Sequence, residues 1–444
     1  MRATNPTRHP DSQPRVGILS GQEIRFRLNG LFRDAITAYP PGEYIARRQG
    51  QTLLLSRDGT TTPLSPPLSL APVDAASTFD LAGVTIGIDF HWEREEEQRF
   101  RGALEILDDG ARLVAVNIVP LEDYLTSVIS SEMRSTSSIE LLKAHAVISR
   151  GWLLAQMEHA RQHRENPPPV PRGGGEYTRW FDREDHHHFD VCADDHCQRY
   201  QGTARATSPM VARAVRETRG EVLLYNGELC DTRFSKCCGG ATERFDLTWE
   251  PRFHPYLIKV DDNDDGAPSP DLTTEANARA WILSSPPASC NTRDRRVLAN
   301  VLNDYDRETP DFFRWQVTYA ADELTDLVER RLGAGLGDIL ALEPVARGVS
   351  GRLTRLAITG TRGRLVIGKE LLIRRALSPT HLYSSAFIVD VDRHPPTRFT
   401  LRGAGWGHGV GLCQVGAAVM SERGYNYRQI LARYFPGALL ETFI

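Results

Sequence analysis

The N-terminal part of the chain alternates apolar and polar positions, which is the pattern of strands with one buried face. Strands are predicted at 15–20, 23–28, 42–47, 52–56, 84–88, 100–107 and 112–119. Turn residues separate them, and Asp108-Asp109-Gly110 joins the last two as a hairpin signal. We therefore expect a small β domain at residues 15–75, preceded by a disordered tail at 1–14.

A helical period replaces this alternation after Pro120. Apolar residues recur at helical spacing through Ile129, and carboxylates occupy the first turn, where they interact favourably with the helix dipole. A second helix is predicted from Ser138 to about His163, so that Glu132 lies at a polar junction between the two.

The rest of the chain mixes both patterns. Strands are predicted at 353–359, 363–367 and 387–391, and helices at 412–423 and from 426. We expect an α+β fold with a mixed, largely antiparallel sheet core and packed helices. The main domain would span residues 80–440, with insertions at about 160–185 and 255–345.

Composition narrows the functional classes. The 444 residues include 53 basic and 57 acidic ones, which argues against nucleic acid as a partner. No apolar run is long enough for a membrane-spanning helix, and no secretory signal is visible at the N-terminus. The seven Cys are an odd number in a long chain, which does not indicate a disulfide framework.

Two segments carry residues suited to chemistry or metal binding. Cys192 and Cys197 lie among four His residues (His186, His187, His188 and His196). Thiolates and imidazoles suit Zn²⁺, although an exposed loop with two free thiols would show the same composition. Cys237-Cys238 precede Gly-Gly; a nucleophilic thiol is one interpretation, and two small residues packed beneath a loop is the preferred one.

A glycine-rich segment at 402–411 contains Trp406 and His408. Its spacing is neither a P-loop nor a dinucleotide motif, and a Trp face beside glycines suits sugar stacking at least as well as phosphate. Glu132, at a loop edge near apolar neighbours, is a candidate general acid. From position alone, an ordinary capping or surface glutamate is the simpler interpretation.

These segments, in this order, resemble the stage II sporulation protein D / amidase-enhancer (SpoIID/LytB) family. The matching stretches are 119–133, 140–150, 190–200, 238–243, 405–417 and 424–437. The resemblance implies a lytic transglycosylase that acts on peptidoglycan glycan strands, especially strands without stem peptides. Glu132 would be the catalytic acid. Arg134 replaces the family's usual Pro, and Cys residues stand where relatives usually carry hydroxyls.

The resemblance also implies the remaining site residues. A zinc ion would be held by Cys192, Cys197 and one histidine, with His186 as first choice and His188 as second. Substrate would be bound by Trp406, His408, Gln414, Cys238 and Arg150. Partners would be glycan strands and a wall amidase, and the location would face the cell wall. The alternatives are a non-catalytic wall-binding amidase enhancer and a zinc- or thiol-dependent hydrolase.

Overall fold

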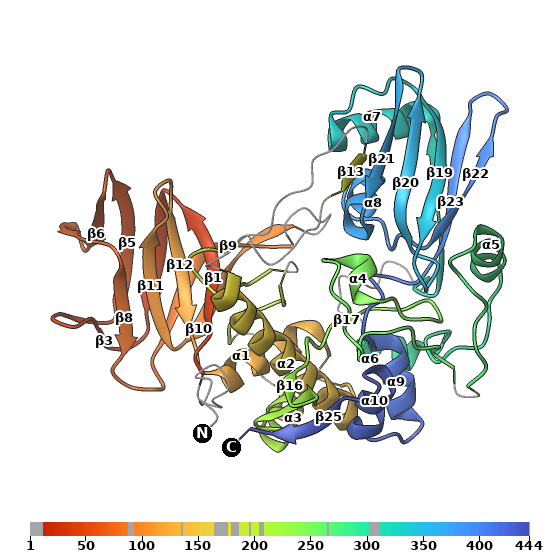
Figure 1. Ribbon diagram of the computed structural model, residues 1–444. Helices are drawn as coiled ribbons and strands as arrows, with labels where there is room; N and C mark the ends of the chain where they lie inside the picture. The colour runs from red at the N-terminus through yellow and green to blue at the C-terminus, as the bar shows by residue number, and fades with distance from the viewer. Residues whose placement is uncertain are drawn as a thin grey trace. The chain divides into compact units, whose positions relative to one another are not determined.

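The computed structural model describes residues 12–87, 93–134, 136–163, 176–178, 186–194, 197–203, 208–263, 266–301 and 311–443 (Figure 1). Two compact units make up the chain. The first comprises 1–165, 183–222 and 441–444, and the second comprises 166–182 and 223–440. The chain therefore enters the second unit after Val222 and returns to the first after Leu440.

Two sheets form the N-terminal half of the first unit. Among the described residues, one has the strand order β14-β1-β12-β11-β8-β3-β4 and the other β10-β9-β2-β5-β6-β7. The strands are β1 Arg15–Gly21, β2 Glu23–Leu28, β3 Phe32–Arg33, β4 Ala38–Tyr39, β5 Gly42–Gln49, β6 Thr52–Arg57, β7 Thr60–Leu64, β8 Leu68–Pro72, β9 Thr78–Ile86, β10 Arg94–Arg101, β11 Ala103–Asp108, β12 Leu113–Ile118 and β14 Val191–Cys192.

The pairing is mostly antiparallel and extends beyond residue 75. β1 pairs with β12 from Arg15 opposite Ile118, and β2 pairs with β9. The rings of Phe79 and Phe100 stack at 5.5 Å between centroids in the apolar core. The strands expected to form a separate small β domain therefore share both sheets with the strands that follow.

Helices complete the first unit. They are α1 Leu121–Glu132, α2 Ile139–His163 and α3 Pro209–Glu217. Ser208 caps α3 by accepting a hydrogen bond from the backbone N–H of Val211. Strand β15 (Glu221–Tyr225) begins in this unit and continues into the second, where it forms a hairpin with β16 (Glu228–Leu229). Strand β25 (Leu439–Thr442) returns the chain to the first unit.

The second unit contains three more sheets. Their orders are β13-β21-β20-β19, β18-β23-β22 and β17-β24. The strands are β13 Glu176–Thr178, β17 Phe234–Ser235, β18 Arg314–Ala320, β19 Ile339–Arg347, β20 Leu353–Gly360, β21 Gly363–Gly368, β22 Phe387–Asp392, β23 Arg398–Ala404 and β24 Leu412–Cys413. The helices are α4 Phe245–Thr248, α5 Glu275–Leu283, α6 Arg295–Val301, α7 Ala321–Leu332, α8 Glu370–Ala376, α9 Gln414–Glu422 and α10 Tyr427–Tyr434.

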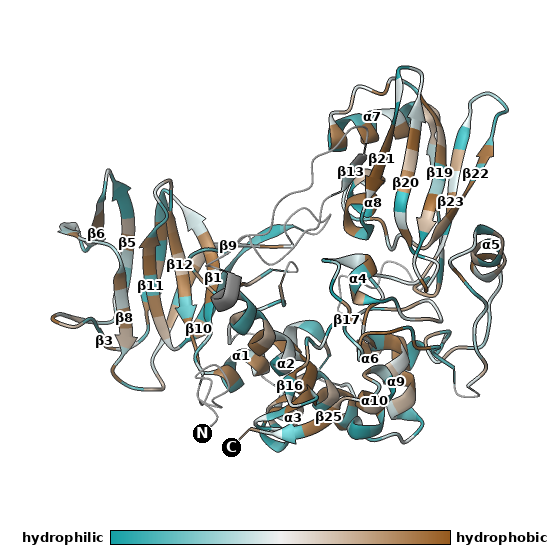
Figure 2. Ribbon diagram, viewed as in Figure 1, coloured by the Kyte–Doolittle hydropathy of each residue, from teal (hydrophilic) through white to brown (hydrophobic). Residues whose placement is uncertain are grey.

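One apolar core holds much of this unit together. Figure 2 shows apolar positions along β20 and β21, and their buried side chains pack with those of α7 and α8. Leu324, Leu356 and Ile373 are fully buried there. Burial of such side chains contributes roughly 1.5–3 kcal/mol each, which explains why the amphipathic helices dock on this sheet.

The α+β fold class predicted from the sequence is confirmed, with largely antiparallel strands and packed helices. The tail at 1–14 and the insertion at about 160–185 fall largely outside the described residues. Within the predicted 255–345 insertion, β18 pairs along its full length with β23. No helix in the described part of the chain is long and apolar enough to cross a membrane.

Candidate functional site

Glu132 is the last residue of α1. The backbone N–H of Met133 makes the final helical bond, to Ile129, and Met133 is itself extended, so the chain leaves the helix at the glutamate. The side chain of Glu132 is half-buried, and its Oε1 accepts a hydrogen bond of 3.2 Å from the backbone N–H of Arg199. The predicted junction carboxylate is thus held by a segment distant in sequence.

Residues 197–200 form that segment, and buried contacts fix it on α1. Gln198 Oε1 accepts a 3.3 Å hydrogen bond from the hydroxyl of Tyr124, and the Tyr124 and Tyr200 rings stack at 5.1 Å. Tyr200 also donates to Asn117 Oδ1 at 2.6 Å. Burial raises the pKa of both phenols, so both remain neutral. The N–H that contacts Glu132 therefore lies in a rigid backbone.

The same segment begins at a cluster of metal-binding side chains. Nitrogen or sulfur atoms of His186, Cys192 and Cys197 all lie within 4.8 Å of one another. His186 Nε2 is 3.3 Å from Cys197 Sγ, and the backbone N–H of Cys192 donates to the same sulfur at 3.5 Å. Two ligands of a tetrahedral zinc ion are separated by roughly 3.5–3.8 Å, so these three residues fit its donor set and spacing.

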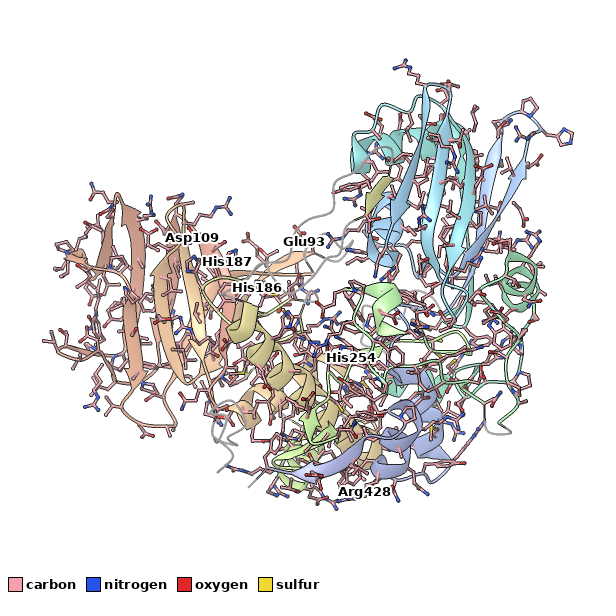
Figure 3. All side chains as sticks on the ribbon, viewed as in Figure 1. Glu93, Asp109, His186, His187, His254 and Arg428 are labelled. Carbon is pink, nitrogen blue, oxygen red and sulfur yellow. The ribbon has the colours of Figure 1, made fainter. Side chains whose placement is uncertain are left out.

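The structure also separates the histidines of this loop. His186 and His187 are both labelled in Figure 3. His187 and His188 are exposed, whereas His186 is half-buried with its ring 4.8 Å from that of Phe189. Phe189 requires Gly17 on β1, because a Cβ at that position would lie 2.5 Å from the ring. His186, the first choice from the sequence, is thus the histidine beside the cysteines. His196 lies outside the described residues.

Two cavities flank this cluster within the first unit. One of about 210 Å³ is lined by His186, Cys192 and Tyr200 together with residues of β1 and β9. A larger one of about 760 Å³ is lined by residues that include His187, His188 and Asp109. Neither cavity includes Glu132 in its lining. These two hollows therefore lie along the loop of His186, Cys192 and Cys197 and not around the glutamate.

Arg150 differs from the sequence expectation of a substrate contact. It is 1% exposed on α2 and forms a bidentate ion pair with Glu122 of α1, at 2.7 and 3.1 Å. Its remaining hydrogen bonds go to the carbonyl groups of Ala146 and Glu221. All these bonds stay inside the fold, which favours a structural role in joining α1, α2 and β15.

The predicted glycine-rich loop lies in the second unit, where it links β23 to β24. Gly405, Gly407, Gly409 and Gly411 all have positive φ. Trp406 lies between the rings of Phe312 and Tyr383, with centroids 4.8 and 4.5 Å away. The alternating glycines thus let the loop fold tightly around a half-buried indole.

His408 of the same loop packs with its ring 4.7 Å from Trp249, and its Nδ1 accepts a hydrogen bond from the backbone N–H of Val410. Burial, followed by the nearby charges of Arg233 and Arg352, lowers its pKa far below the usual range. His408 is therefore a neutral ring in a fixed tautomer, with Nδ1 as acceptor.

Sequence reasoning missed the polar network beneath this loop. Arg352, 1% exposed, donates to the carbonyl groups of Gly407 and Cys238, each at 3.1 Å. Glu243 accepts hydrogen bonds from the hydroxyl and backbone N–H of Ser350. The buried carboxylate of Glu243 and the buried guanidinium of Arg352 thus form a network that supports the glycine-rich loop. Only the Glu of the Cys-Gly-Gly-Ala-Thr-Glu motif offered a signal in the sequence.

Cys238 and Gln414, both expected to bind substrate, are each 2% exposed. Cys238 contacts two other thiols, and Gln414 begins α9 directly after Cys413. Their burial favours structural roles. The sequence-predicted residues thus fall into two groups. Glu132, Arg150 and the cluster of His186, Cys192 and Cys197 lie in the first unit, and the glycine-rich loop with Cys238 and Gln414 lies in the second.

Comparison with known proteins agrees with this division. Residues 109–225, which contain α1, α2 and the cluster of His186, Cys192 and Cys197, match the family described as Stage II sporulation protein. Residues 243–411 match a domain of unknown function, DUF8618. The family match therefore covers Glu132, Arg150, His186, Cys192 and Cys197.

Individual relatives are distant. The chain is 24% identical over 242 residues to the amidase enhancer of Bacillus subtilis, which is 52% of this chain but only 32% of that protein. It is 25% identical to an uncharacterized protein of Brachyspira hyodysenteriae, covering 76% and 71% of the two chains. It is 24% identical to stage II sporulation protein D of B. subtilis, covering 73% and 75%.

Proposed function

We propose that this chain, whose residues 109–225 form a domain of the stage II sporulation protein family, is a peptidoglycan lytic transglycosylase. The family relationship supports a cell-wall-related role. The observation that carries the finer proposal is the geometry of Glu132. A half-buried carboxyl group at a helix end, fixed by the Arg199 N–H, is suited to proton transfer. We propose with this activity that the protein is located where it faces the cell wall.

The chemistry requires only one carboxyl group. Protonated Glu132 donates its proton to the glycosidic oxygen between N-acetylmuramic acid and N-acetylglucosamine, and that bond to the anomeric carbon breaks. The resulting carboxylate then takes the proton of the muramic 6-hydroxyl as its oxygen attacks the anomeric carbon. The products are a 1,6-anhydro-muramic end and a free N-acetylglucosamine end, and Glu132 regains its proton.

A zinc ion held by His186, Cys192 and Cys197 is part of this proposal. When bound, it supplies a cross-link that fixes the loop. Cys197 lies two residues before Arg199, so fixing its sulfur also fixes the N–H that contacts Glu132. These residues thus position the catalytic carboxyl group, and Gln198 and Tyr200 support the same backbone.

The test uses denuded glycan strands and mass spectrometry of the products. We expect the parent chain to release 1,6-anhydro-muramic ends, and Glu132→Gln to lower that rate by roughly 10²–10⁴-fold. Asp123→Asn, which alters an exposed carboxylate of the same helix, is the matched control and should retain activity. Anhydro ends formed by Glu132→Gln at the parent rate would refute the proposal.

The relationship to the amidase enhancer favours one alternative, a non-catalytic wall-binding protein that stimulates an amidase. That function predicts co-sedimentation with sacculi, no new anhydro ends and an unaffected Glu132→Gln variant. The thiol hydrolase alternative is disfavoured at Cys238. That thiol is 2% exposed, and burial raises its pKa well above the usual value.

A further inference from the structure

A second group of metal-binding side chains lies in the other unit, among residues that the proposed activity does not use. It consists of Cys238, Asp262, Cys290 and Cys413, all of them buried. Their three sulfur atoms and one carboxylate oxygen all lie within 4.8 Å of one another. This cluster therefore offers four ligand atoms, one more than the cluster of His186, Cys192 and Cys197.

The spacing matches a tetrahedral ion. Cys238 Sγ and Cys290 Sγ are 3.5 Å apart. Two sulfurs bound at about 2.3 Å to one zinc ion lie roughly 3.8 Å apart along a tetrahedral edge. Only small movements of these side chains would bring all four ligand atoms to bonding distance from a common centre.

The carboxylate is oriented by neighbours, as metal ligands usually are. Asp262 Oδ1 accepts a 2.7 Å hydrogen bond from the Tyr434 hydroxyl, and Oδ2 accepts a 2.8 Å bond from the backbone N–H of Cys290. Helix α9 can approach Asp262 and Tyr434 this closely only because residue 416 is Gly. A Cβ there would lie 2.7 Å from Oδ1 and 2.3 Å from the hydroxyl.

Cys413 is placed where a thiolate is stabilised. It is the N-cap of α9, and its sulfur accepts hydrogen bonds from the backbone N–H groups of Gly416 at 3.4 Å and Cys238 at 3.2 Å. The positive end of the helix dipole acts in the same direction.

Charge argues for a cation at this place. Two nearby cations, Arg314 and Arg352, are engaged elsewhere. Arg314 donates to the carbonyl groups of Ser284, Trp281, Phe313 and Gly239. Arg352 donates to the carbonyl groups of Gly407 and Cys238 and to the Ser350 hydroxyl. An unpaired carboxylate buried among thiols is costly, and a divalent ion removes that cost.

We propose that Cys238, Asp262, Cys290 and Cys413 form a closed, structural binding site for Zn²⁺. Three thiolates and one carboxylate complete a tetrahedron, so no position is left for water or substrate. Binding displaces the remaining thiol protons to solvent. The ion joins the Cys-Cys-Gly-Gly turn, the start of α9 and the Asp262 and Cys290 segments, which are distant in sequence.

The site is tested in a chain whose other cluster has been removed by Cys192→Ser and Cys197→Ser. Purified under reducing conditions and loaded with Zn²⁺, this chain should retain about one ion, measured by mass spectrometry of the metal. Adding Cys290→Ser should lower that value to near zero. Adding Cys230→Ser, which alters a buried thiol of the same unit outside the cluster, should leave it unchanged.

A second measurement does not depend on the folding of any variant of this cluster. Loaded with Co²⁺, the doubly substituted chain should show the intense absorption of tetrahedral cobalt and a thiolate-to-metal charge-transfer band. Absence of these bands, a metal content that Cys290→Ser does not change, or a Cys238–Cys290 disulfide found by mass in the chain purified and denatured without reductant would each overturn the proposal. The result is independent of activity at Glu132.

Discussion

Replacing Gly409 with alanine tests how closely the glycine-rich loop is fitted to the network below it. Gly409 has φ of +78°, and a Cβ there would lie 2.4 Å from the Arg352 guanidinium. The left-handed backbone alone costs alanine about 1–2 kcal/mol. Displacing Arg352 from one of its carbonyl partners costs about 1.5–3 kcal/mol more. We expect Gly409→Ala to lower the free energy of unfolding by about 2.5–5 kcal/mol, the sum of the two contributions.

Gly424→Ala is the matched control for backbone strain. This glycine, in the turn between α9 and α10, has φ of +90°, and a Cβ there meets nothing within 4 Å. Gly424→Ala should therefore lower the free energy of unfolding only by the backbone strain, about 1–2 kcal/mol. The difference between the two variants isolates the steric displacement of Arg352.

Urea unfolding followed by tryptophan fluorescence provides the assay, because Trp406 lies in the same loop. The parent and both variants are compared at one temperature and one pH, with equal slopes required before free energies are subtracted. Equal losses for Gly409→Ala and Gly424→Ala would refute the reasoning. They would mean that Arg352 moves aside at no cost and does not support the loop.

Three further predictions concern buried groups outside the loop. Arg150→Met should destabilise the first unit by about 3–5 kcal/mol in thermal or urea unfolding, because it strands the Glu122 carboxylate; adding Glu122→Gln should restore much of the loss. Burial, and then the charges of nearby arginines, lowers the pKa of His381 to about 3. The free energy of unfolding should therefore fall as the pH drops below about 6.5, by roughly 2 kcal/mol at pH 5. A His381→Gln variant with the same pH dependence as the parent would contradict this. Tyr200→Phe removes the 2.6 Å hydrogen bond to buried Asn117 and should cost about 1–3 kcal/mol in the same assay, whereas an unchanged midpoint would show that the bond contributes nothing.

Local patterns predicted the elements well. The periodicity after Pro120 predicted α1, observed as Leu121–Glu132, and the second helix was expected to end near His163, where α2 ends. Strands predicted at 353–359 and 363–367 correspond to β20 and β21. These elements follow from the spacing of apolar residues, which is visible in a short window. The junction that exposes Glu132 follows from the same signal.

Contacts between distant segments could not be predicted in this way. The network of Glu243 and Arg352 depends on which turns fold against each other, and a short window carries no such information. Asp262 and Cys290 lie in the stretch predicted from the sequence as an insertion at about 255–345, yet both are buried. Arg150 shows the converse, because a charged residue in a family motif suggested a ligand contact and its real partner is Glu122.

The order in which the chain is synthesised gives the division into units a kinetic consequence. The first unit includes residues 441–444, made only after all of 223–440. Phe443 donates its backbone N–H to the Gly220 carbonyl at 2.9 Å, and a Cβ on Gly220 would lie 2.8 Å from the Phe443 carbonyl oxygen. On a ribosome, the first unit must therefore wait with this edge open while the second emerges. Closing so long a loop adds little to the free-energy cost of folding but slows the step, so this edge is the last part of the first unit to form.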